Sequence, residues 1–145
     1  VAGGILWIAT LWLLGPQVIK ETPSFTSPSS SSSSPWQAWE PSKLEQLLAD
    51  NQTVFVDFTA AWCVTCQYNK KTTLSNGQVL ADFQAKNVHL MRADWTRRDP
   101  AISAALAALG RSGVPVYVFY QRGRPPLVLS EVLALEDFRK TVAQL

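Results

Sequence analysis

The sequence predicts an α/β domain in which helices flank a central mixed sheet. Segments of strand-like composition alternate with segments of helical spacing. The apolar fraction of 47% is large enough to build a core, and two β-rich runs near the end are separated by a turn signal. The expected order, β-α-β-α-(α)-β-α-β-β-α, combines parallel crossovers with one terminal hairpin. Such an order places helices on both faces of the sheet.

In the first half, Ser42 and Glu45 have the spacing of a capping box that opens a helix. The run VFVDF is typical of a buried strand, and it leads directly into Trp62-Cys63-Val64-Thr65-Cys66. The expected elements are a short strand over 36–40, a helix from Ser42, a strand over 54–58, a helix from Cys63 to about Thr73, a helix over 78–86 and a strand over 88–93.

In the second half, Asp99 and Pro100 supply an N-cap and a first helical residue, and Gly110 ends that helix. Gly123 lies in the turn of the expected hairpin, and apolar residues at helical spacing form a last helix. The expected elements are a helix between Asp99 and Gly110, strands over 116–120 and 127–130, and a final helix with Leu135, Phe138, Val142 and Leu145 on one face.

The N-terminal third differs from the rest. Residues 1–19 carry no charge and hold a nearly unbroken apolar run, which predicts the end of a transmembrane helix from a longer protein. A cleaved signal peptide is the alternative. Residues 20–35 are rich in Ser and Pro and predict a flexible linker. Residues 36–145 form the folded domain, which we expect to be monomeric.

The charge of the chain does not point to a nucleic-acid partner. Charged residues make up 17% of the chain and the net charge is +2, so no basic footprint is present. The pairs Arg97-Arg98 and Arg122/Arg124 fall in expected loops and are interpreted as solvated surface.

Cys63 and Cys66 are the two cysteines of the chain. A disulfide between them closes so short a loop that it stabilises the fold by about 2 kcal/mol, which favours a chemical over a structural role. At helical spacing their Cα atoms lie about 5 Å apart, within disulfide range. The helix start favours a thiolate, so Cys63 is the expected nucleophile, exposed to solvent, and Cys66 the shielded resolving thiol.

Three interpretations of the pair remain open. A catalytic dithiol is favoured because the motif follows a buried strand and opens a helix. A copper or zinc module would use the same thiols, but His89 is the one histidine that could join them and a closed zinc site needs four ligands. An inert pair is the third. The favoured interpretation requires no metal and no cofactor besides the redox-active disulfide.

Residues 54–66 resemble the active-site strand and turn of thioredoxin-fold proteins. The match is most similar to the C-terminal periplasmic domain of the transmembrane thiol:disulfide interchange family (DsbD and ScsB-like proteins), and it covers residues 36–145. The resemblance implies a thioredoxin fold. It also implies that Asp57 is a semi-buried carboxylate beneath the cysteines that assists proton transfer at Cys66, whereas the residues alone also allow an exposed edge-strand Asp.

The resemblance further implies that Pro115 is a cis-proline against the disulfide. Val114 would then pair through its backbone with an extended client, and Trp62 would contact the same client. One departure concerns the helix after Cys66, where the family carries an acidic residue and this chain has Lys70 and Lys71. These lysines should favour the thiolate and alter the reduction potential.

The expected function is an electron relay. The domain would accept electrons from a membrane-embedded dithiol domain of its parent protein and reduce a periplasmic disulfide protein or N-terminal domain. It would face the periplasm at the bacterial inner membrane. The alternative within redox chemistry is a freestanding membrane-anchored thioredoxin-like reductase for cytochrome c maturation.

Overall fold

A computed structural model describes residues 34–145 of the chain. The predicted membrane segment, residues 1–19, and the linker up to residue 33 lie outside the described residues. Within residues 34–145, no helix is both long enough and apolar enough to span a bilayer.

The described residues form the predicted order of elements. The strands are β1 (Trp36–Ala38), β2 (Thr53–Thr59), β3 (Val88–Asp94), β4 (Val116–Tyr120) and β5 (Leu127–Val128). The helices are α1 (Pro41–Ala49), α2 (Val64–Asn69), α3 (Gly77–Ala85), α4 (Pro100–Ala108) and α5 (Leu135–Ala143), and a π-helical segment, η1 (Lys70–Leu74), continues α2.

The sheet is mixed, as predicted, with the strand order β1-β3-β2-β4-β5. Strand β3 pairs in parallel with both β1 and β2, whereas β4 pairs antiparallel with β2 and with β5. Strand β2 is therefore central, and its residues from Val54 to Thr59 are all buried. A strand covered on both faces needs a nearly continuous apolar run, which is why VFVDF lacks the alternation of a surface strand.

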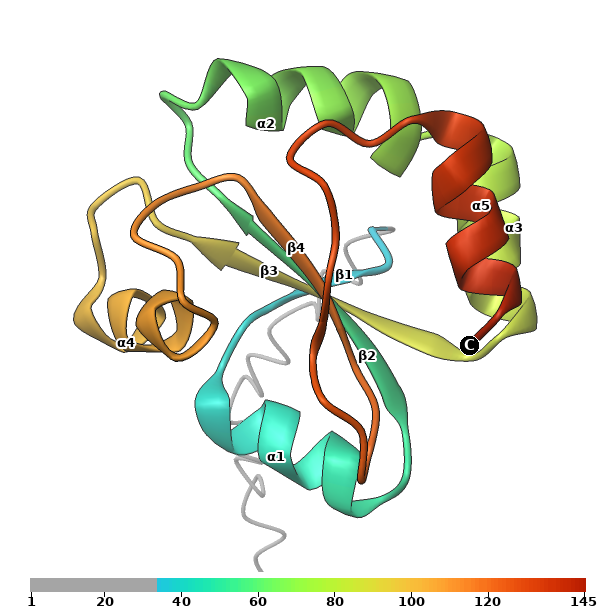
Figure 1. Ribbon diagram of the computed structural model, residues 1–145, viewed down its shortest axis with the longest axis horizontal. Helices are drawn as coiled ribbons and strands as arrows, with labels where there is room; N and C mark the ends of the chain where they lie inside the picture. The colour runs from blue at the N-terminus through green and yellow to red at the C-terminus, as the bar shows by residue number, and fades with distance from the viewer. Residues whose placement is uncertain (1–33) are drawn as a thin grey trace, which may run out of the picture. The chain divides into compact units, whose positions relative to one another are not determined.

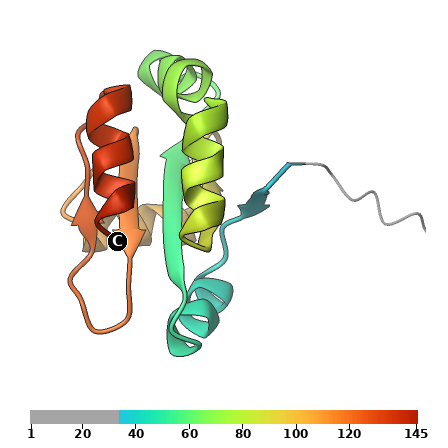
Figure 2. The same ribbon diagram turned by 90° about the vertical axis from the view of Figure 1, so that its right-hand side faces the viewer.

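Two apolar cores lie on opposite faces of the sheet. Val54, Val56 and Phe58 of β2 pack on the face covered by α1 and α4. Phe55 packs on the other face, against residues of α3 and α5. Figure 1 shows α4 and α1 on one side of the strands and α3 and α5 on the other, with α2 crossing above the end of β2. Figure 2 shows α3 and α5 side by side in front of the sheet.

The predicted capping box at Ser42 is wrong. Helix α1 begins at Pro41, and its N-cap, Glu40, makes no side-chain hydrogen bond. Proline has a helical φ and no N–H to satisfy, so it sets the first helical residue and leaves Ser42 inside the helix. The predicted cap of α4 is confirmed, because Asp99 Oδ1 accepts hydrogen bonds from the N–H groups of Ala101 at 2.9 Å and Ile102 at 3.1 Å.

Other boundaries differ by a few residues. Strand β1 ends at Ala38 and β5 at Val128, each two residues earlier than predicted. The helix expected over 63–73 is present, but its second half is the π-helical η1. Tertiary hydrogen bonds act on this segment, since Thr73 Oγ1 donates to the Leu133 carbonyl at 2.7 Å. A pattern of apolar spacing carries no information about such a bond.

Candidate active site

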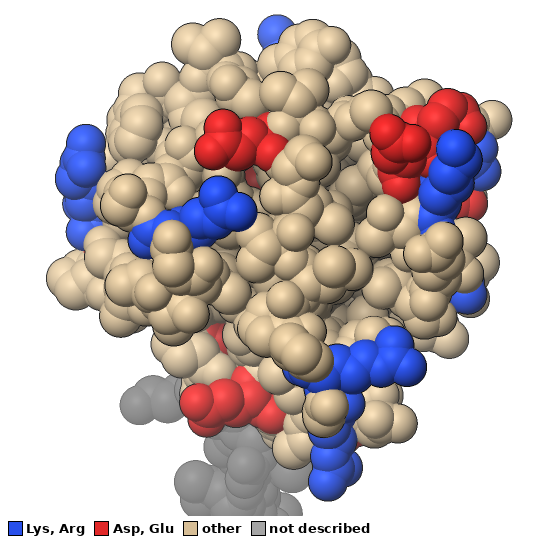
Figure 3. All heavy atoms as spheres, in the orientation of Figure 1, with Lys and Arg blue, Asp and Glu red and all other residues tan. Residues whose placement is uncertain are grey.

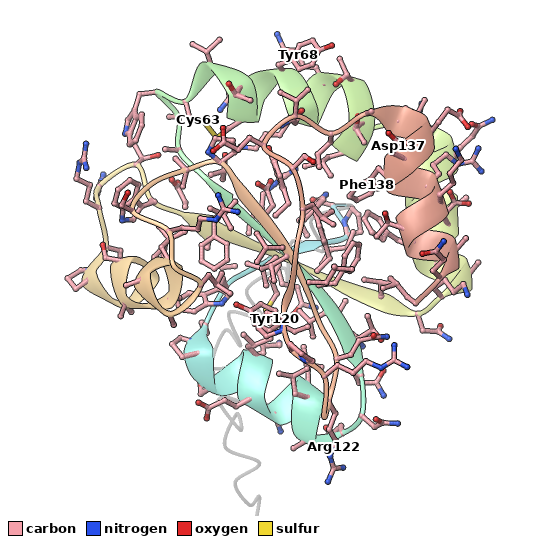
Figure 4. The ribbon with its side chains drawn as sticks, in the orientation of Figure 1. Cys63, Tyr68, Tyr120, Arg122, Asp137 and Phe138 are labelled. Atoms are coloured by element: carbon pink, nitrogen blue, oxygen red, sulfur yellow. A yellow bond between two sulfur atoms is a disulfide. The ribbon has the colours of Figure 1, made fainter. Side chains whose placement is uncertain are left out.

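The cysteine pair lies at the start of α2, where the chain leaves the central strand. Residues 60–62 form the turn between β2 and Cys63, and Cys63 is the N-cap of α2. A disulfide joins Cys63 to Cys66, with a Cα–Cα distance of 5.2 Å, close to the distance expected from helical spacing. Figure 4 shows Cys63 at this end of α2. The pair thus forms its disulfide within a single helical turn.

The two sulfur positions are unequally covered. Cys66 is fully buried, and Cys63 has an exposed fraction of 7%. The predicted ranking is therefore correct, but the expectation that Cys63 would be well exposed is not, because Ala60 and Val114 pack around the disulfide. Cys63 Sγ accepts a hydrogen bond from the Cys66 N–H at 3.2 Å. The same N–H would stabilise a thiolate on Cys63 in the reduced protein.

Asp57 is a fully buried carboxylate on the central strand. This position excludes the exposed edge-strand alternative. Arg92 Nε donates to Asp57 Oδ2 at 3.0 Å, while Oδ1 has no hydrogen-bond partner within the described residues. Burial raises the pKa of Asp57, and the nearby charges of Arg92 and Lys70 oppose that rise. A carboxyl with a raised pKa and an unoccupied oxygen is suited to accept a proton.

Arg92 is a site residue that the cysteine motif does not indicate. It lies opposite Asp57 in the parallel β2–β3 register, and its guanidinium stacks over the Trp36 ring, 4.1 Å from the ring centroid. The alternation of side chains along a strand could have indicated this residue. Arg92 is two residues from the buried Leu90, so its side chain lies on the same face of the sheet. The register with β2 was needed in addition to identify Asp57 as its partner.

The two lysines after Cys66 have different environments. Lys71 is exposed, whereas Lys70 is partly buried and lines a pocket of about 480 Å³ between α2, β1 and β3. Arg92 and Asp94 line the same pocket. Burial lowers the pKa of Lys70, and its attraction to Asp57 counteracts this. Of the two, Lys70 is therefore the lysine coupled to the buried carboxylate, and an effect on the reduction potential stays a prediction for Lys70.

A buried asparagine fixes α2 on the sheet. Asn69 Nδ2 donates to Tyr117 Oη at 2.9 Å and to the Glu131 carbonyl at 2.7 Å, and Oδ1 accepts from the Leu133 N–H at 3.1 Å. Tyr117 lies opposite Asp57 in the β2–β4 register. Asn69 was not predicted as a site residue, because a lone Asn in a helix gives no signal of burial. Its three hydrogen bonds fix the helix that carries Cys66.

The loop after β3 holds the turn before Cys63. Thr96 Oγ1 accepts from the Ala61 N–H at 2.9 Å, and the Thr96 carbonyl accepts from Trp62 Nε1 at 3.1 Å. Asp94 Oδ1 in turn accepts hydrogen bonds from the N–H and hydroxyl of Thr96. Trp62 remains 51% exposed beside Cys63. This placement is compatible with the predicted contact between Trp62 and a client.

The Val114–Pro115 peptide bond is cis, as the resemblance implied. Val114 packs against the cluster that contains both cysteines. Within residues 34–145, no hydrogen bond uses the backbone N–H or carbonyl of Val114. These groups are therefore available to an extended segment, and pairing with a client stays a prediction.

No cluster of three or more His, Cys, Asp or Glu side chains suited to hold a metal occurs in the described part of the chain. His89 is partly buried, and its Nε2 lies 3.3 Å from Gln52 Oε1. It is a hydrogen-bonded histidine on β3.

A family model described as thioredoxin-like matches residues 35–121. The chain belongs to the thioredoxin-like family. The thiol:disulfide interchange protein DsbD of Campylobacter jejuni (strain RM1221) is 26% identical over 102 residues, covering 68% of this chain and 18% of that protein. DsbD of Haemophilus influenzae (strain PittEE) is 29% identical over 97 residues, or 66% of this chain and 16% of that protein. The thioredoxin-like chain therefore corresponds to a small part of these relatives.

Solved structures of other proteins share the fold of this chain. The C-terminal domain of Neisseria meningitidis DsbD in the reduced form matches with a TM-score of 0.62 and 20% identity, over 74% of this chain and 98% of that one. A thioredoxin from Thermus thermophilus matches with a TM-score of 0.59 and 20% identity, over 75% of this chain and 84% of that one. The domain thus has the thioredoxin fold.

Proposed function

We propose that this domain is a thiol-disulfide oxidoreductase that relays electrons from a membrane-embedded dithiol to disulfides of periplasmic partners. The observation that carries the proposal is the disulfide itself. Cys63, at the helix start, keeps an exposed fraction of 7%, and Cys66 on the same helix is fully buried. A purely structural disulfide over so short a loop would add little stability.

Reduction of a partner begins at Cys63. Its thiolate attacks one sulfur of the partner disulfide, a mixed disulfide forms, and the first partner sulfur leaves as a thiolate that takes up a proton. The Cys66 thiol then gives its proton to Asp57, and the new thiolate attacks Cys63 Sγ. The Cys63–Cys66 disulfide forms and the second partner thiolate is released, so two electrons pass to the partner. A membrane-embedded dithiol restores the pair by the reverse exchange and becomes a disulfide itself.

The surroundings of the pair suit this sequence of steps. Trp62 and the backbone of Val114 flank the sulfur that a partner must reach, and we assign them to client binding together with Pro115. The similarity to DsbD proteins supports the parent protein's place in the inner membrane, with this domain in the periplasm. Partners are then the dithiol domain of the same parent and a periplasmic disulfide-containing protein or domain.

Trapping of the mixed disulfide tests the proposal. In the Cys66→Ala variant the resolving thiol is missing, so a partner attacked by Cys63 stays covalently bound and appears as a band that a reducing agent dissociates. The Cys63→Ala/Cys66→Ala variant, expressed identically, should trap nothing. If Cys66→Ala also traps nothing, and the reduced wild-type chain does not reduce a model protein disulfide, the proposal is wrong.

A further inference from the structure

Lys70 lies one helical turn after the resolving cysteine and on the same side of its helix. Its backbone N–H donates a hydrogen bond to the Cys66 carbonyl, and residues at this spacing lie one above the other along the helix. Cys66 is fully buried and Lys70 is partly buried, whereas the next residue, Lys71, is exposed. Of the two lysines, Lys70 is therefore the one that follows Cys66 on the covered side of the helix.

The pocket that Lys70 lines borders the buried carboxylate of the central strand. Thr59 is two residues after Asp57 on β2, and side chains at that spacing share one face of a strand. Arg92 and Asp94 of β3 are the register partners of Asp57 and Thr59. The pocket of about 480 Å³ is lined from the sheet by Thr59, Arg92 and Asp94. Lys70 thus reaches the pocket from the helix, on the β3 side of Asp57.

Three ionisable side chains act on Asp57 within the described residues. Arg92 on β3 donates to Asp57 Oδ2, Tyr117 lies opposite on β4, and Lys70 acts from η1. The Cys66 thiol of the reduced protein, on α2, completes the set. Burial raises the pKa of Tyr117, so this phenol is neutral at neutral pH. The two cations therefore decide the charge around the carboxylate.

Two carboxylates on the sheet, Asp57 and Asp94, attract Lys70. Neither α2 nor η1 has an acidic residue, and in Figure 3 the upper edge of the molecule, where α2 lies, shows no acidic side chain. Asp94 is charged, because hydrogen bonds from Thr96 lower its pKa, and it shares the attraction. Burial lowers the pKa of Lys70, and Asp57 opposes this more strongly than Asp94 does. Lys70 is thus coupled mainly to the buried carboxylate.

We propose that Lys70 is a positioning residue for the resolving step, whose ammonium keeps Asp57 ionised and therefore ready to accept the Cys66 proton. The inference rests on the proposed function and adds a residue to its mechanism. In each cycle Asp57 accepts that proton as the Cys66 thiolate attacks Cys63 Sγ, and Asp57 must return it to solvent before the next cycle. A nearby cation favours the ionised carboxylate and so promotes this return.

Release of a coloured thiol measures the resolving step directly. The full chain, reduced in detergent, reacts with dithiobis(nitrobenzoic acid), which leaves a mixed disulfide on Cys63, and attack by Cys66 then releases a second thionitrobenzoate. Stopped-flow absorbance follows this second release between about pH 6 and 9. Lys70→Met removes the charge but keeps an unbranched side chain. We expect it to be about tenfold slower than the wild type at the acidic end and equal to it at the alkaline end.

Further variants locate the effect. Lys71→Met removes a charge from the exposed neighbour and should leave the profile unchanged, because solvent screens that charge. Lys70→Gln, a second uncharged variant, should share the profile of Lys70→Met, and Lys70→Arg should return most of the rate. In an Asp57→Asn background, Lys70→Met should cause no further loss, because the carboxylate through which Lys70 acts is missing.

The outcomes separate the two proposals. A Lys70→Met profile that coincides with the wild-type profile, or an equal effect of Lys71→Met, would overturn the role of Lys70. A loss that is constant across the pH range, or that persists in the Asp57→Asn background, would overturn it as well, because Lys70 would then act without the carboxylate. If the reduced wild-type chain releases no second thionitrobenzoate at any pH, the proposed function itself fails.

Discussion

At the residue scale, the site depends on a buried carboxylate next to two cations. Asp57 is fully buried, yet Arg92 reaches one of its oxygens and Lys70 lies near enough to affect it. The second oxygen, Oδ1, has no partner in the described residues. Burial raises the pKa of Asp57, and a carboxyl with a raised pKa is a better proton acceptor than an ordinary one.

Asp57→Asn should slow the resolving step at neutral pH. An amide cannot accept the Cys66 proton, and loss of a general base costs about 10²-fold or more. The deficit should shrink as the pH rises, because solvent then deprotonates the thiol. Single-turnover reduction of a peptide disulfide from pH 6 to 9 measures this. A pH–rate profile that coincides with the wild-type profile would remove Asp57 from the mechanism.

The same residue should make stability depend on pH. Because burial raises the pKa of Asp57 above the ordinary value of 3.8, the folded chain holds this proton more tightly than the unfolded chain does. The protonated carboxyl therefore adds stability below about pH 4, and this contribution is lost as the pH rises through the folded pKa. Relative to Asp57→Asn, the wild type should lose unfolding free energy in urea titrations as the pH rises above the ordinary carboxyl pKa of 3.8. A constant difference would mean that the pKa is not raised.

At this scale, the sequence could identify the site residues that lie close together along the chain, but not those that meet only in the folded structure. Cys63, Cys66 and Asp57 are close in sequence, and a motif of adjacent residues includes all three. Arg92 contacts Asp57 across 35 positions, and Asn69 contacts the 131–133 loop across more than 60. Such pairs depend on strand register and loop placement, which composition and spacing do not encode.

At the element scale, α2 is attached to the rest of the fold through Asn69. Asn69→Leu keeps the size of the side chain but leaves the Leu133 N–H, the Glu131 carbonyl and the Tyr117 hydroxyl without their partner. We expect a loss of about 3 kcal/mol in unfolding free energy, since buried polar groups without partners cost about 1–3 kcal/mol each.

Thr72→Ala is the control for Asn69. Thr72 is exposed and bonds its own helix at the Tyr68 carbonyl, so the change should stay within about 0.5 kcal/mol. Urea unfolding of both variants provides the comparison. Similar losses in the two variants would mean that Asn69 acts through helix propensity and not through its tertiary hydrogen bonds.

The starts of α1 and α4 give a second prediction. Asp99→Ala removes a cap that accepts two hydrogen bonds and should cost about 1 kcal/mol. Ser42→Ala should cost nothing and could add a few tenths of a kcal/mol, because Ser42 lies inside α1 and alanine has the higher helix propensity. Thermal unfolding distinguishes the two. A loss at Ser42 equal to that at Asp99 would restore the capping box that Pro41 displaces.

The element order was predictable because most elements have clear starts or apolar patterns. The boundaries that moved are those where two local signals compete, as at Pro41 and Ser42, or where tertiary bonds decide, as in η1. β1 and β5 are edge strands, and each pairs with only part of the strand beside it, β3 or β4. Local pattern fixes the kind of element, whereas neighbours fix where it ends.

At the scale of the whole molecule, the disulfide couples the redox state to folding. The pair lies at the end of the central strand and belongs to a small apolar cluster with Ala60, against which Val114 packs. By thermodynamic linkage, the state with the more stable fold is favoured at equilibrium. A pair that donates electrons needs the oxidised fold to be the more stable, whereas a strong oxidant has a stabilised reduced form.

The oxidised chain should therefore unfold at higher urea concentration than the reduced chain. Closure of the four-residue loop alone gives a difference of about 2 kcal/mol, because it restricts the unfolded ensemble. Urea titrations with and without dithiothreitol measure this difference. Cys63→Ser/Cys66→Ser, which forms no disulfide, should respond identically in both conditions and resemble the reduced chain. A reduced form more stable than the oxidised one would raise the reduction potential of the domain, make it a weaker electron donor and count against the proposed direction of the relay.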